Sequence, residues 1–398
     1  MQRYEIAKDI YYVGVNDRHK HLFENMLPLP YGVSYNSYLI VDEKIALVDT
    51  VEGPFAEELL DNIKEVIGDR RLDYLIVNHM EPDHSSGIRT MLAHYPGLKL
   101  IVNAKTIDML KGYYGLNEDV MLEVKNGEEI SLGGRMLSFH FAPMVHWPEV
   151  MMTYVAKDQI LFSADAFGCF GTLDGAVLDT QLNLGLYFNE MYRYYANIVG
   201  KYGSPVQTAL KKLGGLPLSM ICSTHGPVWT KHIPEVVGIY DELSSGKTQE
   251  GVVIAYGSMY GHTEQMAEMV ARGVASVMKN VRIYDVSTTD HSLLLSEIFK
   301  YKGLILGSPT YCNEIYPNMQ YIMNKIATRN IKDRVFGYWG SFTWAGAAAK
   351  GFALFAESMK WEEPVGLEIK QSMTQAQADE LFELGRQVAE RVKKAFIK

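Results

Sequence analysis

Residues 79–84 read His-Met-Glu-Pro-Asp-His and directly follow the apolar run Tyr74-Leu75-Ile76-Val77. A strand that ends in such a cluster delivers polar side chains to one edge of a sheet, where a metal ion can gather them without leaving a buried charge unpaired. Four of the six side chains are potential ligands, namely His79, Glu81, Asp83 and His84. An ordinary polar loop with a helix cap is the alternative interpretation. The stretch by itself leaves both open.

Three further potential ligands follow strand-like apolar runs later in the chain. His146 follows residues 137–145, Asp165 follows residues 159–164, and His225 follows residues 220–224. A lone histidine at a strand end is more often a hydrogen-bonded structural residue than a ligand. Four strand ends that each carry such residues are not readily coincidental, so the sequence predicts one metal site built from them.

Composition limits the classes of protein to which the chain can belong. Its 398 residues suffice for two domains, and 47% hydrophobic with 21% charged residues is ordinary globular composition. A net charge of -9 without a basic stripe argues against nucleic acid as a partner. The amino terminus lacks the apolar core of a signal peptide and no segment is long enough to span a bilayer, so we expect a cytoplasmic protein without a membrane partner. The three cysteines are too widely spaced for a metal knuckle.

The chain divides into two halves that differ in the predicted order of strands and helices. Strand-like runs at 10–15, 37–41 and 45–50 and an amphipathic helix over 55–67 predict an αβ/βα sandwich in the first half. Residues 243–251 are small and polar, as in a linker. Beyond them, strands and helices alternate as in a doubly wound parallel sheet. We therefore expect one domain at residues 1–248 and a second at 249–398.

Three segments of the second half are typical of a flavin site. Residues 258–263 form a Ser- and Thr-bearing turn between the first strand and helix, which resembles the flavodoxin loop for the phosphate of FMN. Two more loops follow later strands, at the edge where open α/β sheets bind ligands. The aromatic residues there could equally be core packing. The predicted FMN-binding residues are Ser258, Met259, Tyr260, Gly261, His262, Thr263, Ser308, Pro309, Thr310, Tyr311, Asn313, Ser341, Phe342, Thr343, Trp344, Ala345 and Gly346.

The stretch at 79–84 resembles the His-x-His-x-Asp-His signature of the metallo-β-lactamase superfamily, with Glu81 where the zinc hydrolases carry histidine. A carboxylate there hardens the site and suits iron or manganese better than a zinc pair. Joined to a flavodoxin-like half, and with residues 32–39 and His146-Trp147-Pro148, the chain resembles the flavodiiron proteins along essentially its whole length.

The resemblance implies a catalytic diiron site and a reaction. His79, Glu81 and His146 would hold the iron nearer the flavin, Asp83, His84 and His225 the other iron, and Asp165 would bridge the two. The implied reaction is reduction of dioxygen to water, of nitric oxide to nitrous oxide, or of both, with electrons passing through FMN. The family resemblance also implies a head-to-tail homodimer or a dimer of dimers.

Two departures from the family pattern bear on the reaction. Phe23-Glu24 stands where many relatives carry a histidine, which affects the polarity of the pocket and its gas preference. Nothing follows Lys398, so we expect a separate electron donor such as rubredoxin.

Three other functions compete with this interpretation. The chain could be a dinuclear zinc hydrolase whose flavodoxin domain docks a partner, although Glu81 argues against it. It could be a flavodoxin-type electron carrier with a scaffolding first domain, although its full ligand set argues against that. An oxidase of a reduced deazaflavin stays possible within the family.

Overall fold

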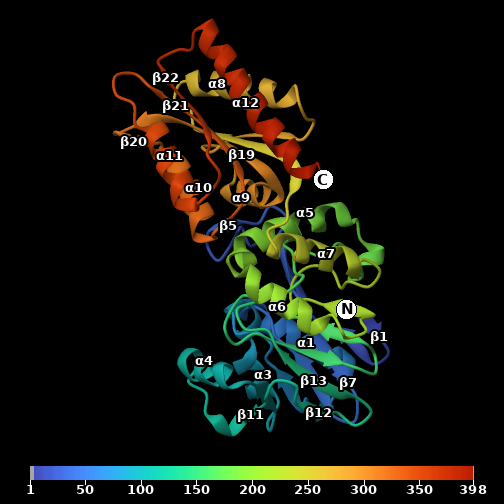
Figure 1. Ribbon diagram of the computed structural model, residues 1–398. Coiled ribbons are helices and arrows are strands. Elements are labelled where there is room, and N and C mark those ends of the chain that lie inside the picture. Colours follow the sequence, from blue (N-terminus) through green and yellow to red (C-terminus); the bar gives the residue numbers. More distant parts are fainter. Residues whose placement is uncertain (1–3, 398) are drawn as a thin grey trace. The chain divides into compact units, whose positions relative to one another are not determined.

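The structure, a computed structural model, describes residues 4–397 and divides into two compact units, Met1–Ser244 and Ser245–Lys398 (Figure 1). The division falls after Ser244, slightly before the boundary expected after Thr248, because helix α7 (Ile233–Ser244) ends there. Strand β17 (Gln249–Tyr256) begins the second unit's sheet five residues later. Among the described residues, no helix is both long enough and apolar enough to cross a membrane.

The first unit contains two main sheets. The larger has the order β1-β2-β7-β8-β9-β10-β11 and is antiparallel up to β8 and parallel beyond it. The smaller, β12-β13-β14-β15-β16, is antiparallel except for the β15–β16 pair. The strands are β1 (Tyr4–Ala7), β2 (Ile10–Tyr12), β7 (Tyr38–Val41), β8 (Ile45–Val48), β9 (Tyr74–Ile76), β10 (Lys99–Val102), β11 (Met121–Glu123), β12 (Glu129–Ser131), β13 (Met136–Phe141), β14 (Met151–Val155), β15 (Ile160–Phe162) and β16 (Met220–Cys222).

Helices and two small hairpins complete the first unit. The hairpins pair β3 (Val15–Asp17) with β6 (Val33–Tyr35) and β4 (Leu22–Phe23) with β5 (Leu27–Pro28). The helices are α1 (Ala56–Ile67), α2 (Pro82–Ser85), α3 (Ile88–His94), α4 (Ala104–Tyr114), α5 (Leu184–Tyr194), α6 (Gly203–Leu213) and α7, with a π-helical turn at Tyr195–Val199 directly after α5. Helix α1 buries Leu59, Leu60 and Ile63 along one face, as its amphipathic pattern predicts.

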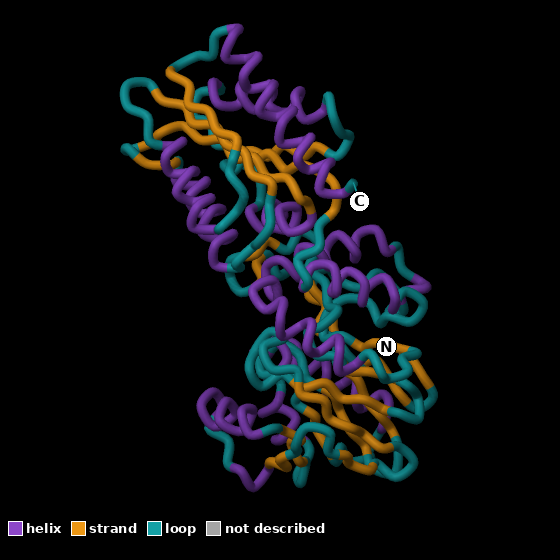
Figure 2. The backbone as a smooth tube through the Cα atoms, in the orientation of Figure 1, coloured by secondary structure: helices purple, strands orange, loops and turns teal. Residues whose placement is uncertain are grey.

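The second unit is a parallel sheet with helices on both faces (Figure 2). Its order, β18-β17-β19-β21-β22, is the doubly wound flavodoxin-like order. The strands after β17 are β18 (Val281–Asp285), β19 (Tyr301–Tyr311), β20 (Glu314–Ile315), β21 (Val335–Phe342) and β22 (Val365–Lys370). The helices are α8 (His262–Ala275), α9 (His291–Lys300), α10 (Pro317–Thr328), α11 (Ala348–Met359) and α12 (Gln375–Phe396).

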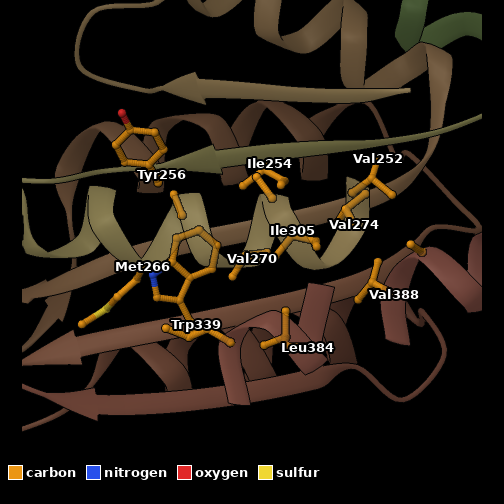
Figure 3. Close-up of a cluster of buried hydrophobic side chains, with 14 of the residues drawn as sticks. Val252, Ile254, Tyr256, Met266, Val270, Val274, Ile305, Trp339, Leu384 and Val388 are labelled. Carbon is orange, nitrogen blue, oxygen red and sulfur yellow. The ribbon is translucent and has the colours of Figure 1, made fainter. Parts of the chain in front are cut away.

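The core of this unit lies between the sheet and helices α8 and α12. Val252, Ile254 and Trp339 from the strands pack against Val270 from α8 and Leu384 from α12 (Figure 3). Burial of such side chains contributes about 1.5–3 kcal/mol each. The predicted fold class, an αβ/βα sandwich followed by a doubly wound sheet, is confirmed.

Two predicted segments differ from the structure in one respect. Residues 308–311 and 341–342 belong to the ends of strands β19 and β21 and not to loops after them. Strand β19 extends because Thr310 and Tyr311 pair with Ile315 and Glu314 of the short antiparallel strand β20. This local hairpin had no hydrophobic alternation from which it could be predicted.

Candidate metal centre and flavin site

The seven predicted metal ligands lie in two adjoining buried groups in the first unit. The first contains His79, Glu81, His146 and Asp165, and the second contains Asp83, His84 and His225. The stretch 79–84 follows β9 of the larger sheet, whereas Asp165 and His225 follow β15 and β16 of the smaller one. Because β15 and β16 are parallel neighbours, their carboxyl ends meet at one edge, and this brings Asp165 and His225 together.

The first group surrounds one point. His146 Nε2 lies 3.1 Å from Glu81 Oε2 and 3.2 Å from Asp165 Oδ2. His79 Nε2 lies 3.4 Å and 3.5 Å from the same two oxygens. Ligand atoms that each lie about 2.1 Å from one ion are separated by roughly 3.0–3.4 Å at octahedral or tetrahedral angles. The four side chains thus have the spacing of one coordination sphere.

The second group has the same spacing. The Nε2 atoms of His84 and His225 each lie 3.3 Å from Asp83 Oδ2. Asp165 Oδ1 lies 3.1 Å from His84 Nε2, while its other oxygen belongs to the first group. Asp165 therefore turns one oxygen toward each group, which is the arrangement of a bridging carboxylate.

Several polar atoms of this pocket are placed to bind a cation but have no hydrogen-bond partner among the described residues. His79 Nε2 and both oxygens of Asp83 are buried and make no hydrogen bond with described residues. Burying such atoms without partners is costly, and burying charges costs more. Metal ions at the two positions would satisfy them.

The electrostatics of the pocket point the same way. Burial by itself lowers the pKa of His146, but the carboxylates of Asp165 and Glu81 raise it to about 9. Burial likewise lowers the pKa of His84, and the charges of Asp83 and Asp165 raise it to about 9. Burial raises the pKa of Asp165, but the neighbouring histidines lower it well below its usual value. The carboxylates of the pocket therefore stabilise positive charge at these histidines, as they would stabilise a bound metal ion.

Several supporting residues of this pocket were missed by the sequence analysis. His79 Nδ1 lies 2.8 Å from Glu149 Oε1, and His225 Nδ1 lies 2.7 Å from the main-chain oxygen of Ser34. Asp49 accepts the main-chain N–H of Asn78 at 2.8 Å. Each of these partners lies far in sequence from the residue that it contacts, so no local motif indicated the pairing.

The hairpin of β4 and β5 borders the same pocket. Phe23 packs edge-on against the ring of His225, with ring centroids 5.6 Å apart. Glu24 follows it at a positive φ of 47°. Partial desolvation and the charge of Glu81 both raise the pKa of Glu24, although much of this residue is exposed. Glu24 thus brings a carboxyl group near the ligands.

The predicted flavin-binding segments meet at the carboxyl ends of three neighbouring strands, β17, β19 and β21. Thr263 Oγ1 lies 3.0 Å from Ser341 Oγ, which joins the first segment to the third. Thr310 Oγ1 accepts the main-chain N–H of Ala347 at 3.0 Å, which joins the second to the third. All three segments therefore border one sheet edge.

The first of these segments has the features of a phosphate cradle. Ser258 Oγ accepts the N–H of Gly261 at 3.0 Å, and Gly261 has a φ of 91° that favours glycine. Helix α8 begins at His262, so the N–H groups of its first turn lie at this loop, where that of Glu264 donates to Ser258 Oγ at 3.4 Å, and Thr263 is buried in the same turn. Beside the turn, Tyr260 and Trp344 are 90% and 86% exposed, so their ring faces are available to a flavin ring. The residues fit FMN.

Comparisons with known proteins agree with this geometry. The ODP family beta lactamase model matches residues 33–226, and the flavodoxin model matches residues 254–385. The chain is 32% identical to a nitric oxide reductase of Moorella thermoacetica, over 97% of this chain and 98% of that protein.

Solved structures extend the similarity to the whole chain. A rubredoxin oxygen:oxidoreductase from Desulfovibrio gigas is similar with a TM-score of 0.95 and 28% identity over 100% of both chains. A flavodiiron protein from Giardia intestinalis is similar with a TM-score of 0.95 and 26% identity over 99% of this chain and 97% of that one. The chain therefore belongs to the flavodiiron protein family.

Proposed function

We propose that this protein reduces nitric oxide to nitrous oxide, dioxygen to water, or both, at a non-haem diiron site supplied with electrons through FMN. The observation that carries the proposal is the pair of ligand groups that share Asp165, whose two oxygens face different groups. The relatives named for nitric oxide and oxygen chemistry support it. Glu81 in the ligand set supports iron over a hydrolytic zinc pair.

The proposed ligand assignment follows the two groups. His79, Glu81 and His146 would hold one iron, Asp83, His84 and His225 the other, and Asp165 both. When bound, the two irons and FMN supply electron storage and transfer. Reduction of two molecules of nitric oxide to nitrous oxide and water takes up two electrons and two protons, and reduction of dioxygen to two waters takes up four of each. The contribution of the chain is to hold the donor atoms of seven side chains, including both oxygens of Asp165, at fixed distances in a buried pocket.

FMN is proposed to bind in the second unit. Ser258, Thr263 and N–H groups of the first turn of α8 would hold its phosphate. The aromatic residues Tyr260 and Trp344 would lie against its ring. The segments around Thr310 and Ser341 would provide the remaining contacts.

The electron donor and the assembly are proposed from the family resemblance. A rubredoxin-type protein would reduce the flavin, in line with the name of the Desulfovibrio gigas relative. A head-to-tail homodimer, or a dimer of such dimers, is the proposed assembly, and sedimentation velocity would test it. A cytoplasmic location stays a prediction from the sequence.

The test is an anaerobic stopped-flow experiment on the fully reduced protein, mixed separately with nitric oxide and with dioxygen. About two irons and one FMN per chain, with rapid reoxidation by at least one gas and no accumulation of peroxide, are expected. Two zincs and no iron in protein made under iron-replete anaerobic conditions would contradict the proposal and favour a hydrolase.

A further inference from the structure

Glu149 is a buried carboxylate that contacts a proposed metal ligand without belonging to either ligand group. It is 1% exposed and lies three residues after His146, before strand β14. Its Oε1 lies 2.8 Å from His79 Nδ1 and accepts the main-chain N–H of Met80 at 2.9 Å. Its main-chain oxygen accepts a hydrogen bond from the Asn103 amide at 2.6 Å.

These contacts orient the ring of His79. With Glu149 accepting the hydrogen of Nδ1, the Nε2 atom keeps its lone pair and faces Glu81 and Asp165. Because Glu149 follows His146 closely in the chain, it also ties the loop that carries His146 to the loop that carries His79. One side chain thus couples two ligands of the first group.

The charge of Glu149 is only partly compensated. Its Oε2 is buried and has no hydrogen-bond partner among the described residues. The edge of Trp147 packs on His79, with ring centroids 5.4 Å apart, so that side of the ring is apolar. In such low-dielectric surroundings the negative charge of a carboxylate interacts strongly with the imidazole ring and with a cation bound to that ring.

In the second group, no carboxylate among the described residues contacts the Nδ1 atom of a ligand histidine, as Glu149 contacts that of His79. His225 Nδ1 donates to the neutral main-chain oxygen of Ser34, and His84 Nδ1 has no hydrogen-bond partner among residues 4–397. An imidazole whose N–H is accepted by a carboxylate is a stronger electron donor to a metal ion than one whose N–H is accepted by a main-chain carbonyl. The two groups would therefore hold their ions in different electronic environments.

We propose that Glu149 is a positioning residue that stabilises the oxidised state of the ion held by His79, Glu81 and His146, and so makes the two iron positions unequal in reduction potential. The proposal rests on the diiron function proposed above. Its physical basis is that a buried negative charge stabilises the more highly charged ferric ion more than the ferrous ion.

The experiment compares E149Q with N103S in the full-length protein. E149Q removes the charge but keeps an oxygen that can accept from His79 and Met80. N103S replaces the N-cap residue of α4 with serine, which can also cap a helix. It removes the side-chain amide that donates to the main-chain oxygen of Glu149, so it changes packing and not charge. Reduction potentials come from a redox titration followed by the electron paramagnetic resonance of the half-reduced diiron centre, and iron content is measured in parallel.

Because the proposal gives this ion the lower reduction potential, it takes up its electron in the second step. We expect E149Q to retain iron and to shift that second reduction step to a more positive potential, while N103S lowers thermal stability and leaves both potentials at the parent's values. Equal potentials in E149Q and the parent would overturn the proposal, as would an equal shift in N103S. If E149Q holds no iron, the same redox titration is made on E149D, which keeps the negative charge. E149D protein that binds iron at the parent's reduction potential supports the proposal, and a shifted potential or no bound iron overturns it. Absence of iron from the parent would instead refute the diiron function.

Discussion

The imidazoles of His84 and His225 face each other with their Nε2 atoms 3.1 Å apart in a fully buried pocket. Two ring nitrogens at this distance repel each other unless a proton or a metal ion lies between them. Since Asp83 lies within 3.3 Å of both, a cation at this position would be held by these three side chains and by Asp165 Oδ1, which lies 3.1 Å from His84 Nε2.

Asp165→Ala should remove most of the bound iron, because this carboxylate turns one oxygen toward each ligand group. Metal analysis by mass spectrometry should give about two irons per parent chain and far fewer in the variant. Asp61→Ala, on the exposed face of α1, is the matched control and should keep the parent's iron content. Full iron occupancy in Asp165→Ala protein would contradict a bridging role.

The metal-free protein should lose stability as the pH rises from about 6.5 to about 9. The pKa of His84 and that of His146 are raised to about 9, above the value of about 6.5 expected in the unfolded chain. The stabilising protons are therefore bound below pH 6.5 and leave as the pH passes the folded-state values. Urea unfolding of the metal-free protein across this range measures the effect.

The iron-loaded protein is the control for this pH dependence. Metal ions replace the protons on the histidines, so its free energy of unfolding should change much less over the same range. Loading iron at neutral pH should also release protons into a weakly buffered solution. A metal-free protein equally stable at pH 6.5 and pH 9 would refute the electrostatic account of the pocket.

Ser258→Ala together with Thr263→Ala should weaken FMN binding, because hydrogen bonds to a charged phosphate are lost. At roughly 1.5–3 kcal/mol for a hydrogen bond to a charged group, each loss corresponds to a roughly ten- to hundredfold higher dissociation constant. Quenching of flavin fluorescence on titration into the flavin-free protein measures it.

Two controls isolate the phosphate contribution. Riboflavin lacks the phosphate, so its affinity should change little in the same double variant. Ser276→Ala changes a serine at the opposite end of helix α8 and should leave FMN affinity unaltered. Equal losses for FMN and riboflavin would mean that the two hydroxyls support the loop and not the phosphate.

Glu81→Ala should separate electron delivery from gas chemistry. The ligand lies in the first unit and the flavin loop in the second, so a rubredoxin-type donor should still reduce the flavin. Rapid reduction of dioxygen to water should be lost, and the remaining slow flavin oxidation should release peroxide. Stopped-flow spectroscopy with a peroxide assay distinguishes these outcomes. Water production at the parent's rate without peroxide would favour the flavodoxin-type carrier instead.

The sequence predicted the parts of the site that follow strands, because a strand end delivers its next residues to one edge of a sheet. His79, Asp165 and His225 each follow such a strand, and this is why the structure brings them together. Glu149 and Ser34 could not be found this way. Their contacts with His79 and His225 span 70 and 191 residues and depend on tertiary packing. The extension of β19 through Tyr311 was missed because it depends on pairing with only two residues of β20.

The distribution of ligands over two sheets also sets an order for assembly on the ribosome. His79, Glu81, His146 and Asp165 are all synthesised before helix α5, whereas the second group lacks His225 until almost the whole first unit has been made. A nascent chain can therefore complete one group early and the other only late. Ions bound at both groups would therefore join segments that left the ribosome far apart in time.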